Sequence, residues 1–240
     1  NDFNINIKEK LIDVKKMNLK CDYFFYLSPR YLKEYKKFLS AKYILSGSIK
    51  SNIYKVMPSK EESIILISQF NTDRVKNKDQ EYLLAEKIVL KNLIKFCKSK
   101  NKLLQIFLRF GNKKEKNYFT SLLNNDDLEI INFIWKNKIS EKFQFLDNSK
   151  LIVCLDSTLG YEMIARKKKV LLLSFRDKFL KKEVFRFSHF GFSDEDIPKE
   201  GPFWLNRYNN ESEIIFKINS IYETPLNKLI LEYDINKEGL

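Results

Sequence analysis

Continuous apolar runs are the feature of this sequence that most restricts its fold. The three clearest are SIILIS at residues 63–68, LIVCL at 151–155 and KVLLLS at 169–174. A strand with one solvated face alternates apolar and polar residues, whereas a strand covered on both faces does not. These runs therefore predict a parallel sheet with helices on both of its faces.

The segments around these runs alternate between strand and helix patterns. Residues 80–99 repeat apolar side chains at helical spacing, and residues 48–62 form a polar stretch without clear periodicity. Further strands are predicted at 22–27, 43–45, 103–108 and 129–133, and further helices at 29–39, 114–123, 140–148, 159–166 and 211–222. The order predicts an α/β fold, a Rossmann-like doubly wound parallel sheet.

Four segments follow from this organisation. We expect the end of a preceding α/β domain at 1–50, a crossover linker at 51–62, a Rossmann-like domain at 63–225 and a C-terminal tail at 226–240. Because the chain begins on Asn1 and not on Met, we also expect further sequence upstream.

The charge balance favours anionic partners. The 44 Lys and Arg residues against 31 Asp and Glu give a formal net charge of +13. Lysine is spread along the whole chain with Asn and Ile, which indicates compositional bias, and no nucleic-acid-binding motif accompanies it. We therefore expect no nucleic-acid partner, and a peripheral contact with an anionic membrane is the better candidate.

Other compositional features narrow the function further. No apolar run reaches the roughly 18–20 residues that span a bilayer, and no leader pattern stands at the N-terminus. With one histidine in the chain, no conventional metal site is expected. Cys21, Cys97 and Cys154 form no C-x-x-C pair, so buried free thiols in a reducing cytosol are expected.

The turn after the strand at 151–155 carries the strongest functional pattern. Asp156, Ser157 and Thr158 come directly after that strand and before a helix, whose N-terminal N–H groups and partial positive charge suit a phosphate. The hydroxyls add donors, Gly160 allows a close approach, and the Glu162 carboxylate can accept from ribose hydroxyls. A simple helix cap, with Glu162 as its capping partner, explains the same residues, and the local pattern leaves both interpretations open.

The run DSTLGYEMIARKKKV resembles the nucleotide-binding turn of the C-terminal domain of GT-B glycosyltransferases. It also resembles the D-S-G-G-x-x-E turn of nucleotide-sugar 2-epimerases, but Thr158 and Tyr161 depart from the epimerase pattern. The resemblance implies that Ser157, Thr158 and Gly160 contact the donor's phosphates and that Glu162 holds the ribose or the sugar. Residues 63–174, with GPFW at 201–204, look most like bacterial surface-carbohydrate biosynthesis proteins.

Residues at the ends of other predicted strands extend this candidate site. Arg109 follows the strand at 103–108, where the resemblance implies a basic residue facing the donor phosphates; a solvated loop cation is the alternative. Ser68 and Gln69 end the strand at 63–68 and are predicted to line the cleft.

Two aromatic-rich features complete the list of candidates. His189, in the run RFSHFGF, is a candidate catalytic base or a packed residue. Trp204 could line a sugar pocket or pack a C-terminal corner. The lysines at 167–169 are interpreted as a solvated turn at the opposite edge of the sheet.

Together, these features and the resemblance predict a metal-independent GT-B glycosyltransferase. It would transfer a sugar from a nucleotide-sugar donor to a cell-surface polysaccharide or lipid-linked glycan, in the cytoplasm or peripherally at the inner face of the membrane. The nucleotide-sugar would be substrate, with no further cofactor. A nucleotide-sugar 2-epimerase, a polyol-phosphate transferase and a non-catalytic nucleotide-binding domain are the alternatives.

Overall fold

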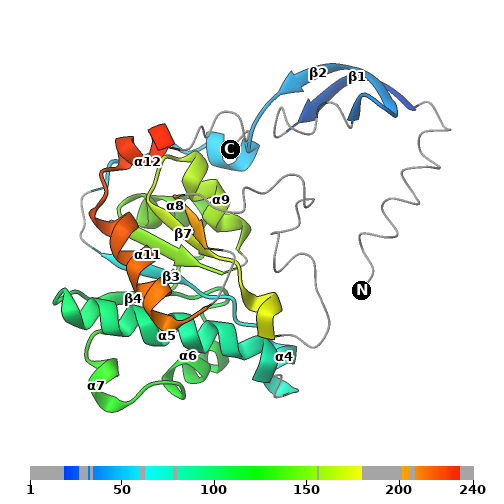
Figure 1. The fold of residues 1–240 in the computed structure, drawn as a ribbon. Helices are drawn as coiled ribbons and strands as arrows, with labels where there is room; N and C mark the ends of the chain where they lie inside the picture. The colour runs from blue at the N-terminus through cyan, green and yellow to red at the C-terminus, as the bar shows by residue number, and fades with distance from the viewer. Residues whose placement is uncertain are drawn as a thin grey trace. The chain divides into compact units, whose positions relative to one another are not determined.

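The computed structural model describes residues 19–26, 32, 35–59, 63–77, 80–155, 157–179, 202–205 and 209–232 (Figure 1). The chain divides into two compact units, residues 1–53 with 234–240, and residues 54–233. Asp156, His189 and Gly201, which the sequence singled out, lie outside the described ranges.

The second unit is built on a six-stranded parallel sheet, which confirms the predicted fold class. The strand order is β5-β4-β3-β6-β7-β8. The strands are β3 (Ile64–Ile67), β4 (Leu104–Phe107), β5 (Ile131–Ile134), β6 (Leu151–Cys154), β7 (Val170–Leu173) and β8 (Trp204–Leu205). Every residue of β3, β6 and β7 is buried, as their continuous apolar sequences require.

Helices cover both faces of this sheet. Figure 1 shows α5 and α11 side by side on one face, with α8 and α9 on the other. The longer helices are α5 (Gln80–Ser99), α6 (Lys113–Thr120), α8 (Ile139–Asp147), α9 (Thr158–Ala165) and α11 (Glu211–Glu223). The bounds of α5 are those predicted from its apolar spacing, because a twenty-residue amphipathic helix carries a strong periodic signal.

The strand order places a topological switch point at the centre of the sheet. The chain runs from β3 outward to β4 and β5, and it then returns through α8 to β6 on the other side of β3. The connections that leave β3 and β6 therefore diverge toward opposite faces. In open α/β sheets, ligands bind at this switch point, beyond the carboxyl ends of the strands.

Several short elements were not predicted. The helices α4 (Thr72–Lys76) and α7 (Asn125–Leu128) replace expected loops, and α12 (Leu226–Glu232) occupies part of the expected tail at 226–240. Helices of four to seven residues are too short to show a period. Asparagine caps mark two of them: Asn71 accepts from the N–H groups of Asp73 and Arg74, and Asn124 accepts from that of Asp127.

The first unit contains two parallel strands, β1 (Leu19–Tyr26) and β2 (Leu39–Leu45), followed by the short helix α3 (Ile49–Asn52). Phe24 pairs with Tyr43 in register, and its ring makes edge-to-face contacts with Tyr43 and Tyr35 at 5.9 and 4.8 Å. On the opposite face of β1, the side chains of Tyr23 and Phe25 are exposed.

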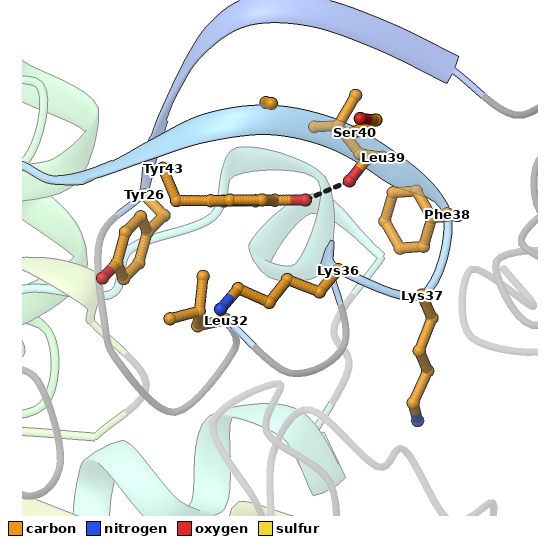
Figure 2. Close-up of a pocket in the computed structure, with 9 residues that line it drawn as sticks. Tyr26, Leu32, Lys36, Lys37, Phe38, Leu39, Ser40 and Tyr43 are labelled. Carbon is orange, nitrogen blue, oxygen red and sulfur yellow. Dashed lines mark hydrogen bonds between the residues drawn. The ribbon is translucent and has the colours of Figure 1, made fainter.

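A cavity of about 680 Å³ lies on the aromatic side of these strands (Figure 2). Tyr26, Phe38 and Tyr43 contribute rings to it, and the hydroxyl of Tyr43 donates to the Leu39 carbonyl. The Lys36 ammonium extends to 5.8 Å from the centre of the Tyr43 ring. Burial raises the pKa of Tyr43, so this phenol stays protonated at neutral pH. The cavity thus combines ring faces with a cation.

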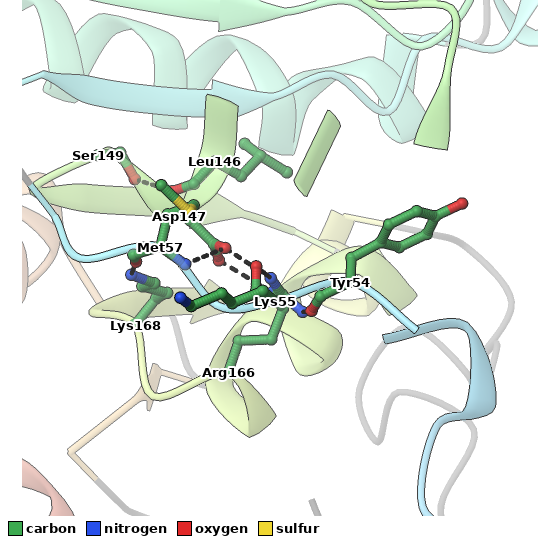
Figure 3. Close-up of polar contacts among 8 residues, drawn as sticks. All are labelled: Tyr54, Lys55, Met57, Leu146, Asp147, Ser149, Arg166 and Lys168. Atoms are coloured by element: carbon green, nitrogen blue, oxygen red, sulfur yellow. Dashed lines mark hydrogen bonds and ion pairs between the residues drawn. The ribbon is translucent and has the colours of Figure 1, made fainter. Parts of the chain in front are cut away.

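The turn between α9 and β7 is packed at Arg166 and Lys168, so the prediction of a solvated turn at 167–169 is wrong for Lys168, whereas Lys167 is exposed as predicted. Arg166 and Lys168 are 3 and 6% exposed. The Arg166 guanidinium donates to both carboxylate oxygens of Asp147, at 2.9 and 2.5 Å, and to the carbonyls of Tyr54 and Lys55 (Figure 3). Sequence alone could not show this, because the partners lie 19 and more than 100 residues away.

The cysteines differ from one another in exposure. Cys97 and Cys154 are buried, as predicted, and burial raises the pKa of the Cys97 thiol to about 12. Cys21 is exposed on β1, so the prediction of a buried thiol is wrong for it. Most residues of β1, the strand that carries Cys21, are exposed.

Candidate functional site

Predicted site residues from three strands meet at the switch point. Ser68 and Gln69 follow β3, Ser157 follows β6, and Arg109 follows β4. Because β3 pairs with both β6 and β4 in parallel, the carboxyl ends of all three strands lie at one edge of the sheet. The structure thereby brings together residues that are up to 89 positions apart in the sequence.

Ser157 is the N-cap of α9. Its backbone is extended (φ −89°, ψ 125°), and its hydroxyl accepts from the N–H of Leu159 at 3.3 Å. That distance is at the long end of the range for hydrogen bonds, so an incoming phosphate oxygen could take the place of the hydroxyl at low cost. Thr158, the first residue of the helix, is exposed at the same edge. The cap interpretation is thus correct for Ser157, and it is compatible with a phosphate site.

Glu162 is not a capping partner. In a capping box the carboxylate sits at the third helical position, which here is Gly160. Glu162 is the fifth residue of α9, in its second turn, and it is partly buried. Because residues four apart share a helix face, it lies below the exposed Thr158. Its predicted role toward a ribose or a sugar stays a prediction.

Gly160 lies on the side of α9 that faces the sheet. A Cβ added there would come within 2.4 Å of the Cys154 sulfur and 2.7 Å of a Leu172 methyl. A glycine is therefore required by the close packing of the helix on β6 and β7, not by the approach of a ligand. The third glycine of dinucleotide-binding turns has the same role.

We expect Gly160→Ala to destabilise the protein by about 1–3 kcal/mol, because overpacking outweighs the roughly 1 kcal/mol by which alanine favours a helix. Urea unfolding measures this difference. Thr158→Ala, at an exposed position of the same helix, serves as the control and should be nearly neutral. A Gly160→Ala variant that is more stable than the wild type would contradict the packing role.

A buried carboxylate that the sequence analysis missed organises the loop after β4. Glu115, in the first turn of α6, is fully buried. Its Oε1 accepts from the Ser68 hydroxyl at 2.5 Å and from the N–H of Arg109 at 2.7 Å. Its Oε2 accepts from the N–H groups of Phe110 and Gly111, at 2.8 and 3.1 Å. Three of these hydrogen bonds fix the backbone that carries Arg109, and the fourth links Glu115 to Ser68 at the end of β3.

A second buried carboxylate fixes the loop after β3. Glu86 of α5 accepts from the N–H of Gln69 at 3.1 Å and from the hydroxyl of Tyr118 at 3.0 Å. Burial, and then the negative charge of Glu86, raise the pKa of Tyr118, which therefore remains a donor. Ser68 is itself buried against Glu115. It therefore supports the loop and does not line the cleft as predicted.

Exposed side chains beside this loop form a cationic and aromatic surface. Phe110 and Trp135 are each 46% exposed, and the guanidinium of Arg109 lies 5.0 Å from the centre of the Phe110 ring. Gly111 has a left-handed backbone (φ +66°) and lies against the Trp135 ring. A Cβ added at Gly111 would come within 2.1 Å of Cγ of that ring. Such a surface can bind an anion and stack on a planar or sugar ring.

Two further candidates differ in outcome. Trp204 is 6% exposed and pairs with Leu172 in the edge strand β8, so it contributes to the core and offers no open ring face to a sugar. His189 lies outside the described residues, and its catalytic role stays a prediction.

The described residues contain no group of three or more His, Cys, Asp or Glu side chains that could hold a metal ion. Within the same part of the chain, none of the helices has the length and apolar character needed to cross a bilayer.

Comparison with known proteins identifies the family of the chain. A family model described as "putative O-antigen biosynthesis protein" matches residues 6–229. No curated protein matches the sequence.

Two solved structures are similar to this chain, and the first of them shows its fold. A GtfA/B complex is 12% identical with a TM-score of 0.53, over 99% of this chain and 45% of the other. A mutant O-GlcNAc transferase from Thermobaculum terrenum is 9% identical with a TM-score of 0.46, over 91% of this chain and 40% of the other. The chain spans less than half of either structure, and the first likeness establishes the fold alone.

Proposed function

The chain belongs to this O-antigen biosynthesis family, and on that premise we propose that residues 54–233 bind the nucleotide-sugar donor of a GT-B glycosyltransferase that builds a surface polysaccharide or lipid-linked glycan. One observation carries the proposal. The N-terminus of α9, with Ser157 and Thr158, stands at the switch point of the sheet, and Arg109 follows β4, on the other side of β3 from β6.

The donor phosphates would bind between these groups. The first-turn N–H groups and the hydroxyls of α9 would hold one side of the phosphates, while the Arg109 guanidinium holds the other. As the bond from sugar to phosphate breaks, negative charge grows on the leaving phosphate, and a preorganised helix N-terminus and cation stabilise it without a metal. Glu162 would accept from ribose or sugar hydroxyls.

The two exposed rings extend the donor site. Phe110 lies beside Arg109 on the loop that three hydrogen bonds to Glu115 hold in place, and Trp135, which follows β5, lies against Gly111 of the same loop. We assign them to stacking on the base or the sugar of the donor, because a rigid ring face binds such groups with little loss of conformational freedom.

The acceptor would contact the first unit. The cavity lined by Tyr26, Phe38 and Tyr43 offers ring faces suited to sugars, and Lys36 offers a cation suited to an acidic or phosphorylated one. The catalytic base is not assigned among the described residues, and His189 remains the candidate that the sequence supplies.

Thermal shift with CMP, UDP, GDP and their sugars tests the donor site. A matching nucleotide at about 100 times its Kd stabilises by about 2.7 kcal/mol, which raises the Tm by roughly 5–10 °C for a chain of this size. Arg109→Ala should weaken binding roughly tenfold to hundredfold, since it removes a charge-assisted contact. Lys228→Ala removes an exposed lysine from α12 and should leave the affinity unchanged.

The reaction is tested separately by turnover. Transfer that requires a glycan acceptor supports the glycosyltransferase, whereas isomerisation without acceptor indicates an epimerase. Transfer of a polyol phosphate indicates a polyol-phosphate transferase, and binding without turnover a non-catalytic domain. If no nucleotide stabilises the protein, the donor site itself is wrong.

A further inference from the structure

A basic groove opens at the amino edge of the sheet, at the opposite end of the strands from Ser157. It has a volume of about 860 Å³ and lies where β6 and β7 begin and α9 ends. None of the described residues that line it is acidic, and five are basic: Lys150, Arg166, Lys167, Lys168 and Lys169. We propose that this groove docks the chain on the phosphate headgroups of an anionic membrane.

The frame of the groove is cationic and rigid. Arg166 and Lys168 are buried, and the Lys168 ammonium donates to the carbonyl of Met57 (Figure 3). The carboxylate that faces both cations is Asp147, whose oxygens accept from Arg166 and from the N–H of Met57. Among the described residues the frame thus has one carboxylate for two buried cations, and this positive excess favours an anion in front of it.

Lysines at the rim add charge that solvent can reach. Lys167 is exposed and has a left-handed backbone (φ +56°). It is the C′ residue of a Schellman motif, in which its N–H donates to Ile164 and that of Lys168 donates to Met163, at 2.8 and 3.0 Å. Glycine is the usual residue there, so the position carries a lysine at a conformational cost.

Two further rim lysines stand against Tyr222. Lys169 donates to the Tyr222 carbonyl at 2.8 Å, and the Lys150 ammonium lies 5.3 Å from the centre of the Tyr222 ring. The nearby carboxylate, Glu223, is ion-paired with Lys100 at 2.5 Å. Lys100, followed by Lys150 and Lys169, lowers the pKa of Glu223. Its negative charge is thus shared among three lysines, and the rim keeps a positive excess.

Exposed apolar side chains on the same edge distinguish a membrane from a soluble anion. Val56 and Met57 line the groove and are 46 and 38% exposed. Leu226 of the short helix α12 also lines it. Apolar side chains do not contribute to the binding of a soluble phosphate. Protein surfaces that bind membranes peripherally combine exposed apolar side chains with lysines.

Vesicle co-sedimentation tests the proposal with the full chain. The wild type should bind vesicles of phosphatidylcholine with about one-third phosphatidylglycerol and should not bind phosphatidylcholine alone. The Lys150→Gln/Lys167→Gly variant should bind at least tenfold more weakly, since each lysine near an anionic surface contributes roughly fivefold. The glycine keeps the turn geometry, and an unchanged Tm confirms that the variant is folded.

A matched variant, Lys76→Gln/Lys87→Gln, removes two charges elsewhere and should bind within about twofold of the wild type. Three results overturn the proposal: no binding to anionic vesicles, an equal loss in the matched variant, or stabilisation by inorganic phosphate at constant ionic strength without vesicle binding. The second result would assign binding to the overall charge of +13, and the third would assign the groove to a soluble anion.

Discussion

Replacing Arg166 by leucine is expected to destabilise the second unit by about 3–5 kcal/mol, because it leaves the Asp147 carboxylate buried without its cation. The two side chains are 2 and 0% exposed. The variant also loses the bonds to the carbonyls of Tyr54 and Lys55 and the contact with the Phe143 ring at 4.6 Å. With roughly 2–4 °C per kcal/mol, the Tm should fall by about 6–20 °C.

A double-mutant cycle separates the buried charge from the lost packing. Arg166→Leu/Asp147→Leu removes both charges and should recover part of the loss, because a buried ion pair replaced by apolar residues is often nearly neutral. Recovery should be incomplete, since the carbonyls of Tyr54 and Lys55 still lack their donor. As a control, Lys91→Gln breaks an exposed ion pair with Glu211 and should leave the Tm unchanged. An Arg166→Leu variant that unfolds like the wild type would contradict the assignment.

The same ion pair shows where sequence reasoning stops. The apolar runs around β3, β6 and β7 identified the sheet, because burial on both faces leaves a continuous apolar signature. The lysines at 167–169 were interpreted as a solvated turn. The contact that buries Lys168 in this turn is its hydrogen bond to the Met57 carbonyl, and Met57 lies more than 100 residues earlier in the sequence. Long-range polar partners leave no periodic trace in a single sequence.

The residues of the candidate site also fall into two groups, those that local sequence pattern could locate and those that depend on distant segments. Ser157 and Arg109 were found because strand ends and helix starts can be located from local pattern. Glu115 and Glu86 were missed because an acidic residue on an amphipathic helix looks solvated, and its burial depends on amides of another segment. For Glu115 a local signal did exist: it follows the N-cap Asn112 at the spacing of a capping box. Gly160 was recognised as a candidate phosphate contact, which stays a prediction, but its packing role was missed because its contacts lie on neighbouring strands.

Glu115→Gln is expected to destabilise the protein by roughly 3 kcal/mol or more, although the two side chains have the same shape. The carboxylate accepts from the Ser68 hydroxyl and from the N–H groups of Arg109, Phe110 and Gly111. A glutamine must turn its own NH₂ donor toward some of these donors, and each buried donor left without an acceptor costs about 1–3 kcal/mol. Ser68→Ala removes one of the four bonds to Glu115 together with the bond from the Phe70 N–H to the Ser68 hydroxyl, and should cost about 1–3 kcal/mol.

Hydrogen exchange reads out the specific consequence. In Glu115→Gln, the amides of Arg109, Phe110 and Gly111 should exchange much faster than in the wild type, while those of the distant β7 remain protected. Any nucleotide affinity should fall as well, because a loosened loop no longer holds the Arg109 guanidinium and the Phe110 ring in place before the ligand arrives. Slow exchange of these three amides in a stable variant would show that the loop does not depend on Glu115. The rigidity of the proposed donor site would then need another origin.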